Sequence, residues 1–198
     1  MTSPTSSKYV IQLRGTNASG KSTAMRQYCA ARGLKPTWLD TSPKRTKIMS
    51  DGKISVLGWY QPYAIAEGCD AALSGGAQLL NALEALFKQG QEVIAFEGMI
   101  YSNTYLLPTR VDRLAKKYGY KFIACFLACS YTTELQRLMN RNGGKDIDFD
   151  NFDMKFYTSR KSFGKLLQSS ILCYEVATDR IPIDDMGGVI EEAIRGCK

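Results

Sequence analysis

Residues 15–22, GTNASGKS, constrain the fold of this chain more than any other stretch of its sequence. They follow a β-prone apolar run, residues 8–13, and open a stretch of helical character, residues 20–32. Glycine at both ends lets the backbone turn tightly and approach an anion closely. The amides of residues 17–22 then point inward beside the positive end of the helix. The strand–loop–helix context therefore predicts a phosphate-binding loop.

The side chains of this loop indicate which phosphates it binds. We expect Lys21 to reach the β- and γ-phosphates of ATP, and the Ser22 hydroxyl to ligate Mg²⁺. ATP and Mg²⁺ are therefore the predicted cofactors. The predicted nucleotide-binding residues of the loop are Gly15, Thr16, Asn17, Ala18, Ser19, Gly20, Lys21, Ser22 and Thr23.

Strand-like and helix-like segments alternate along the rest of the chain, which predicts a three-layer α/β fold with a parallel sheet. The Asp-Gly pair within residues 49–55 predicts a hairpin in an otherwise irregular stretch, residues 42–63. We expect one domain over residues 1–198, with a flexible tail at 1–8 and a lid loop at 143–151. The predicted strands are residues 8–13, 37–40, 92–96, 121–128 and 171–177, and the predicted helices are 20–32, 76–89, 108–118, 132–142, 153–169 and 189–195.

Composition excludes several classes of function. The chain has no histidine, so a general base has to be a carboxylate or a less usual group. Six cysteines occur without a CxxC pair, which favours reduced core thiols over a zinc site. No apolar run is long enough to span a bilayer and the first residues lack an export signal, so we expect a cytoplasmic protein, in the host cytoplasm if it is phage-encoded.

Two acidic residues end predicted strands. Asp40 follows the run TWL, and Glu97 follows VIAF. Ligands of open parallel sheets bind beyond the carboxyl ends of the strands, and transfer of a phosphoryl group to a hydroxyl needs a proton acceptor and an acid that organises Mg²⁺. Asp40 and Glu97 are the candidates for these two roles, although Asp40 could instead cap a turn.

Arg137 and Arg141 are four residues apart and therefore share one face of a predicted helix. The pair Gly143-Gly144 follows, so the two arginines lie at the base of the predicted lid, where they could stack on adenine and neutralise a developing phosphoryl charge. Arg160 and Lys161 on the next helix could also close over the site. The alternative is a solvated helix face that includes Glu134.

Together these motifs resemble the P-loop nucleoside and nucleotide kinase family over nearly the whole chain, residues 9–195. The resemblance implies a five-stranded parallel sheet in the order 2-3-1-4-5, with helices on both faces and a small lid. It implies that Arg137 stacks on adenine and Arg141 contacts phosphate. It also implies Ser22 and Glu97 at the metal, Lys21 and Arg141 in catalysis, and Asp40 as the base, as in the polynucleotide and shikimate kinase branches.

The run after Glu97, Gly98-Met99-Ile100, differs from the Asp-Arg-Tyr of thymidylate kinases and the Glu-Arg-Ser of deoxynucleoside kinases. The stretches IQLRGTNASGKST and FEG more closely resemble small bacteriophage kinases that act on 5-hydroxymethyluracil within DNA. That resemblance implies transfer of the ATP γ-phosphate to the hydroxymethyl group of a base in DNA. A kinase of a free nucleotide, of a polynucleotide end or of another small hydroxyl metabolite is the alternative.

A net charge of +7 is compatible with a DNA partner. Two basic stretches could contact its backbone or stack on unpaired bases, although both could equally be solvated surface with core aromatics. An ATP-dependent nucleic-acid binding protein without an acceptor hydroxyl is a further alternative. The stretches comprise Lys44, Arg45, Lys47 and Lys53 with Trp59, Tyr60 and Tyr63, and Arg110, Arg113, Lys116, Lys117 and Lys121.

Overall fold

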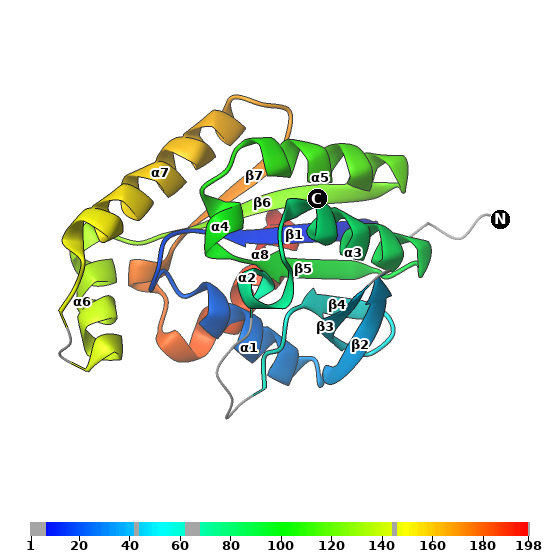
Figure 1. Cartoon of the computed structure of the whole chain (residues 1–198), viewed down its shortest axis with the longest axis horizontal. Coiled ribbons are helices and arrows are strands. Elements are labelled where there is room, and N and C mark those ends of the chain that lie inside the picture. Colours follow the sequence, from blue (N-terminus) through cyan, green and yellow to red (C-terminus); the bar gives the residue numbers. More distant parts are fainter. Residues whose placement is uncertain (1–6, 42–43, 62–67, 144–145, 198) are drawn as a thin grey trace.

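The computed structural model describes residues 7–41, 44–61, 68–143 and 146–197. Seven strands form one sheet in the order β2-β3-β4-β5-β1-β6-β7, and helices cover both of its faces (Figure 1). The strands are β1 (Lys8–Arg14), β2 (Lys35–Thr41), β3 (Lys44–Ser50), β4 (Ile54–Leu57), β5 (Val93–Glu97), β6 (Tyr120–Ala128) and β7 (Leu172–Ala177). The helices are α1 (Lys21–Ala31), α2 (Cys69–Ala72), α3 (Gly76–Lys88), α4 (Met99–Ser102), α5 (Leu106–Lys117), α6 (Tyr131–Asn142), α7 (Phe149–Leu167) and α8 (Val189–Gly196), with 3₁₀ turns η1 (Thr178–Arg180) and η2 (Ile183–Gly188).

The predicted α/β class is confirmed, but the predicted sheet of five parallel strands is wrong. The five predicted strands keep their relative order, and β3 and β4 are inserted between β2 and β5. β4 pairs parallel with β5, whereas β3 pairs antiparallel with β2 and with β4. The sheet is therefore mixed and has seven strands.

The inserted strands come from the hairpin that the Asp-Gly pair predicts, and this prediction is confirmed. Asp51 Oδ1 accepts hydrogen bonds from the amides of Lys53 at 2.8 Å and Ile54 at 2.7 Å, which fixes the turn. Buried Ile48 and Leu57 pair across the two strands, so the hairpin joins the core of the sheet. Within the stretch 42–63, which was expected to be irregular, residues 44–50 and 54–57 are thus strands.

Each face of the sheet has its own apolar core. Residues of α3, α5 and α7 pack on one face, and residues of α1, η2 and α8 pack on the other. The apolar residues of β1 and β6 supply both cores because successive side chains point to opposite faces of a strand. β1 lies between β5 and β6, so the loop after it begins at the centre of the sheet.

α6 and the first half of α7 extend beyond the sheet, at the left of Figure 1. They are joined by a separate small cluster of Leu138, Phe152 and Phe156. The predicted lid loop, residues 143–151, lies partly outside the described residues at 144–145, and its last three residues belong to α7. Of the predicted tail, residues 1–6 also lie outside, while Lys8 begins β1. No helix in the described ranges is long and apolar enough to cross a membrane.

A completely buried arginine, Arg14, ends β1. Its guanidinium donates hydrogen bonds to the carbonyl oxygens of Tyr101 at 3.0 Å, Ser102 at 2.5 Å and Thr104 at 3.1 Å, and to Ser162 Oγ at 2.9 Å. No carboxylate of the described residues pairs with it, and burial lowers its pKa to about 10. Arg14 therefore fastens the end of the central strand to α4 and α7.

Candidate active site

A cavity of about 580 Å³ opens where β1 and β5 end. Its walls are the loop after β1, the start of α1, residues 68–71, residues 97–99, one face of α6 and residues 181–186. The volume is that of a site for a small organic ligand. The cavity therefore lies at the carboxyl ends of the central strands, as expected for an open α/β sheet.

The loop between β1 and α1 has the backbone that an anion cradle requires. Gly15 has φ 136° and Gly20 has φ 100°, values at which an L side chain is strained. A Cβ atom at Gly15 would lie 2.6 Å from Ser19 Oγ, and one at Gly20 would lie 2.6 Å from Met186 Cε. Ser19 Oγ donates a hydrogen bond to the Thr16 carbonyl at 2.9 Å, and this bond within the loop stabilises the turn. Only glycine fits at both ends of the loop.

Lys21 begins α1 and is almost completely buried beneath this loop. Its ammonium donates to the carbonyl oxygens of Gly15 at 3.0 Å and Thr16 at 2.6 Å. Burial lowers the pKa of the ammonium, and the carboxylates of Glu97 and Glu134 oppose this shift. The loop thus holds a cation against the cavity wall, where a phosphate would meet it.

Glu97 ends β5 and pairs in register with Leu13, so its carboxylate lies beside the start of the loop. Glu97 Oε1 accepts hydrogen bonds from Ser22 Oγ at 2.9 Å and from the Tyr60 hydroxyl at 3.1 Å. Ser22 and Glu97, the two predicted metal ligands, are thus in direct contact. Tyr60, which the sequence placed in a stacking surface, is instead buried behind Glu97.

Asp40 does not belong to this cavity. It lies on the edge strand β2, with a side chain 83% exposed, and its carboxylate pairs with Arg45 Nε at 3.0 Å. β3 and β4 separate β2 from β5, so these two strands are about 14 Å apart at the ordinary strand spacing. The expectation that both acids meet at one edge is wrong because β4, and not β2, is the neighbour of β5.

Asp70, which the sequence analysis did not select, supplies the second carboxylate of the cavity. It lies in the first turn of the short helix α2, and its Oδ2 accepts hydrogen bonds from the amides of Met99 and of Ile100, the latter at 3.3 Å. Its Oδ1 is buried and has no hydrogen-bond partner among the described residues. Asp70 therefore has one oxygen fixed and the other free to accept a proton.

Both predicted arginines of α6 line the opposite wall. Arg137 donates to the Thr178 carbonyl at 3.1 Å and approaches Cys129 Sγ at 3.4 Å, which orients its guanidinium beside the residues 181–186. Arg141 is exposed at the rim. Arg160 does not reach the cavity, because its guanidinium turns toward the other side of α6, where Glu134 is buried rather than solvated.

We expect Arg137→Ala and Arg141→Ala to separate two effects. Loss of the Arg137 guanidinium should weaken ATP binding by about tenfold, because this planar cation is expected to stack on adenine. Loss of Arg141 should lower turnover by about tenfold or more with less effect on ATP binding, because it removes positive charge from the phosphate side. Equilibrium binding and steady-state kinetics check the two effects, and unchanged values for both variants would return this face of α6 to a solvated surface.

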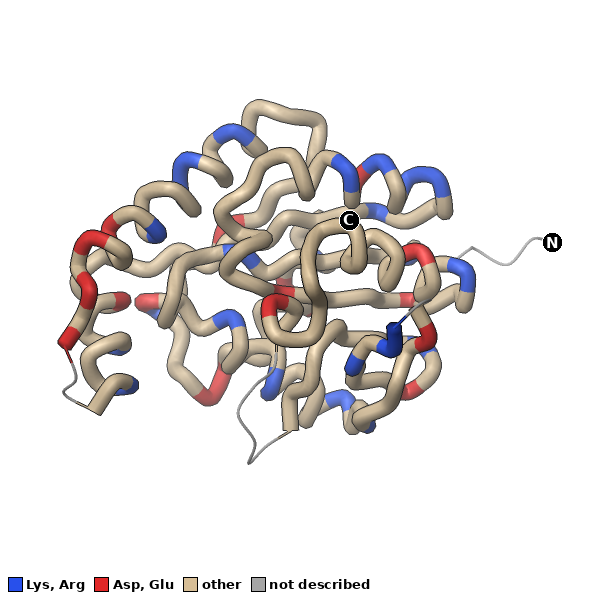
Figure 2. The backbone as a smooth tube through the Cα atoms, viewed as in Figure 1, with Lys and Arg blue, Asp and Glu red and all other residues tan. Residues whose placement is uncertain are grey.

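The two basic stretches lie outside the cavity. In the hairpin, Lys47 lies 4.8 Å from the Trp59 ring centroid, and Trp38 packs edge-on against Trp59 at 5.6 Å. On α5, Arg110 and Arg113 line a separate groove of about 300 Å³ against α3. Figure 2 shows further Lys and Arg positions along α5 and the second half of α7. Tyr63, the remaining aromatic residue of the first stretch, lies outside the described residues.

No protein-family model matches the chain, and no curated protein matches it. Two solved structures of the deoxyadenosine kinase from M. mycoides are similar to it, one with bound dCTP and one with bound dATP. Each gives a TM-score of 0.46 over 94% of this chain and 99% of the kinase chain, with 15% and 12% sequence identity respectively. At these values the two kinases are distant neighbours, and no activity is transferred from them.

Proposed function

We propose that the protein is an ATP-dependent phosphotransferase that transfers the γ-phosphoryl group to an alcohol. One observation carries this proposal: a single cavity collects the Lys21 ammonium, the Asp70 and Glu97 carboxylates, and the guanidinium groups of Arg137 and Arg141. Phosphoryl transfer depends on positioning and on charge stabilisation, and these groups supply both. The resemblance of the motifs to P-loop kinases supports the same function.

The reaction assigns a role to each group. The acceptor oxygen bonds to the γ-phosphorus of ATP while the bond from that phosphorus to the β–γ bridging oxygen breaks, and ADP leaves. We propose that Asp70 takes the proton of the acceptor alcohol, because its Oδ1 is free while the Met99 amide holds Oδ2. Lys21 and Arg141 stabilise the charge of the phosphates, and Arg137 holds the base of ATP.

The residues present fit Mg²⁺. Ser22 Oγ and Glu97 Oε1 are hard oxygen donors 2.9 Å apart, and Tyr60 fixes the carboxylate from behind. Ser22 and Glu97 would hold the ion, which neutralises phosphate charge when bound. The described residues contain no cluster of three His, Cys, Asp or Glu side chains suited to a metal. Structural zinc sites have four protein ligands, whereas Ser22 and Glu97 would leave most positions around the ion to phosphate and water.

For the acceptor, we propose the hydroxymethyl group of 5-hydroxymethyluracil within DNA. The net charge of +7 and the basic residues of the hairpin and of α5 support a polymeric phosphodiester over a single nucleotide. The stretches IQLRGTNASGKST and FEG support the modified base. A free nucleotide acceptor competes with this proposal, since the cavity lacks any feature that would by itself exclude it.

Incubation with γ-labelled ATP and three acceptors tests both parts of the proposal. The acceptors are DNA that contains hydroxymethyluracil, the same DNA with thymine, and free hydroxymethyldeoxyuridine monophosphate, each followed by nucleoside analysis. We expect label only on hydroxymethyluracil in DNA. Faster labelling of the free nucleotide would replace the DNA acceptor with a metabolite, and ATP hydrolysis without label transfer to any acceptor would favour an ATP-dependent nucleic-acid binding protein.

A double variant, Lys44→Gln with Arg45→Gln, tests the contact with DNA. We expect it to raise the apparent KM for DNA severalfold and to flatten the salt dependence of that KM, because fewer counterions are released on binding. The KM for ATP should remain unchanged. Lys35→Gln with Lys165→Gln removes the same charge from other exposed positions and is the matched control. Equal effects of the two double variants would show that only net charge matters.

A further inference from the structure

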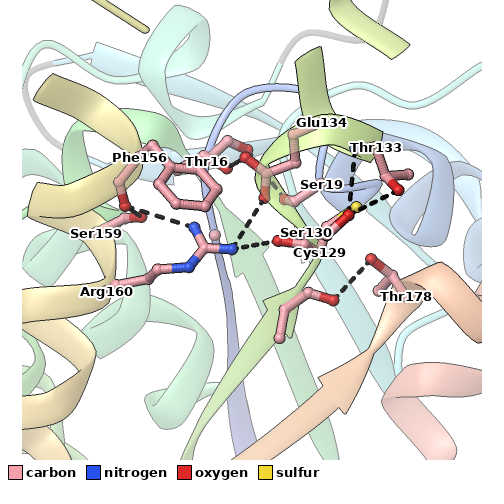
Figure 3. Close-up of polar contacts among 12 residues, drawn as sticks. Thr16, Ser19, Cys129, Ser130, Thr133, Glu134, Phe156, Ser159, Arg160 and Thr178 are labelled. Atoms are coloured by element: carbon pink, nitrogen blue, oxygen red, sulfur yellow. Dashed lines mark hydrogen bonds and ion pairs between the residues drawn. The ribbon is translucent and has the colours of Figure 1, made fainter. Parts of the chain in front are cut away.

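A fully buried carboxylate, Glu134, contacts the phosphate loop at Thr16 (Figure 3). It lies in the first turn of α6, whose N-terminus Ser130 caps by accepting a hydrogen bond from the Thr133 amide. Glu134 Oε2 accepts a hydrogen bond from the hydroxyl of Thr16, a residue of the loop. α6 therefore contacts the phosphate loop through Thr16, whose side chain is buried and does not line the cavity.

Arg160 reaches the same carboxylate from α7. Its Nη2 lies 3.6 Å from Glu134 Oε1 and donates a hydrogen bond to the Cys129 carbonyl. Its Nη1 donates a hydrogen bond to the Phe156 carbonyl at 3.5 Å. Its guanidinium carbon lies 3.4 Å from the Phe156 ring centroid, so the ring of Phe156 packs against the cation. Glu134 Oε1 has no hydrogen bond within the described ranges, which leaves it room for a proton.

Three cations face Glu134 from the elements packed around it. Lys21 belongs to the loop and α1, Arg137 to α6 itself, and Arg160 to α7. Burial raises the pKa of Glu134 to about 7, and the charges of Arg160 and Lys21 oppose this shift. The chain has no histidine, so no imidazole masks a titration in this range.

We propose that Glu134 and Arg160 are positioning residues that fix Thr16 and join α6 and α7 to the phosphate loop, so that nucleotide binding is coupled to proton uptake by Glu134. This inference rests on the proposed binding of ATP. Nucleotide phosphates bring negative charge to the other side of the same loop, and that charge favours the neutral carboxyl. A proton therefore moves from solvent to Glu134 on binding, and the affinity falls as the pH rises through about 7.

The test is the pH dependence of ADP affinity, without metal, between pH 6 and 9. For the unmodified protein we expect the affinity, relative to that of Glu134→Gln, to fall by about tenfold over this range, as one pKa unit of coupling requires. The terminal phosphate of ADP also titrates near this range, and it does so equally in both proteins, so the ratio isolates Glu134. Identical profiles for the two proteins would overturn the inference.

Arg160 variants supply the second, independent measurement. Arg160→Gln removes a facing cation and should shift the midpoint of the affinity profile to higher pH, whereas Arg160→Lys retains the charge and should restore the midpoint. A purely structural role would weaken binding at every pH without moving the midpoint, and an unmoved midpoint would overturn the inference even if Glu134→Gln does not fold. Failure of the unmodified protein to bind ADP at any pH would instead overturn the proposed function, and this inference with it.

Discussion

Lys21→Ala is expected to lower phosphoryl transfer by about 10³-fold or more while the fold is retained. The substitution deletes the cation nearest the transferred group, and interactions of this kind act chiefly on the transition state. The fold should persist because, among the described residues, the ammonium donates hydrogen bonds only to two loop carbonyls, and its burial is itself unfavourable, as its lowered pKa indicates. Label transfer from ATP and thermal unfolding check the two halves of this expectation.

The matched control for this variant is Lys35→Ala, which removes an exposed lysine from β2 and should leave transfer within about twofold of the unmodified protein. Near-normal turnover by a folded Lys21→Ala protein would contradict the phosphotransferase proposal itself. Loss of the fold would instead show that the phosphate loop depends on this ammonium even without a nucleotide.

Asp70→Asn is expected to lower turnover by about 10²- to 10⁴-fold with little effect on ATP binding. Asparagine retains an oxygen that accepts from the Met99 amide, so α2 and residues 97–99 should keep their positions, but it cannot take a proton from the acceptor. Asp40→Asn provides the comparison, because the same chemical change falls on an exposed ion pair of small energetic value. Steady-state kinetics of the two variants at saturating ATP measure the contrast.

Glu97→Gln completes this set. It should also lower turnover by about 10²-fold, but through weaker binding of Mg²⁺, so that a higher Mg²⁺ concentration partly restores the activity. If Asp40→Asn proved as harmful as Asp70→Asn, the proton acceptor would have to be assigned again. If Glu97→Gln were insensitive to Mg²⁺, Glu97 would be the better candidate for the base.

The phosphate loop was predictable because its function depends on local backbone geometry. Two glycines with positive φ, a lysine and a hydroxyl at fixed spacing leave few alternatives when a strand precedes and a helix follows. Glu97 was predictable for a related reason. A carboxylate directly after a buried strand is costly to bury without a partner, and it lies at the strand end where ligands of such sheets bind. Glu97 and the loop residues Lys21 and Ser22 line the same cavity.

Asp40 and Asp70 show where this reasoning stops. Position in a sheet depends on which strands are neighbours. The small hairpin separates β2 from β5 because β4 pairs with β5, and no periodicity in the sequence predicts this long-range pairing. Asp70 belongs to a helix of four residues, too short to leave a pattern in the sequence. Glu134 entered the sequence analysis only as part of an alternative, solvated helix face, because its contacts with Thr16 of the loop and Arg160 of α7 are long-range.

The buried guanidinium of Arg14 has a consequence for how this cavity can change shape. Its hydrogen bonds to the carbonyl groups of Tyr101, Ser102 and Thr104 hold the segment that follows the cavity-lining residues 97–99 against the end of the central strand. The wall formed by α6 is held differently, because α6 and the first half of α7 pack on an apolar cluster that is separate from both cores of the sheet. We therefore expect opening and closing of the cavity to displace α6 and the first half of α7 more than the 97–104 segment, because α6 and the first half of α7 are not packed into either core of the sheet.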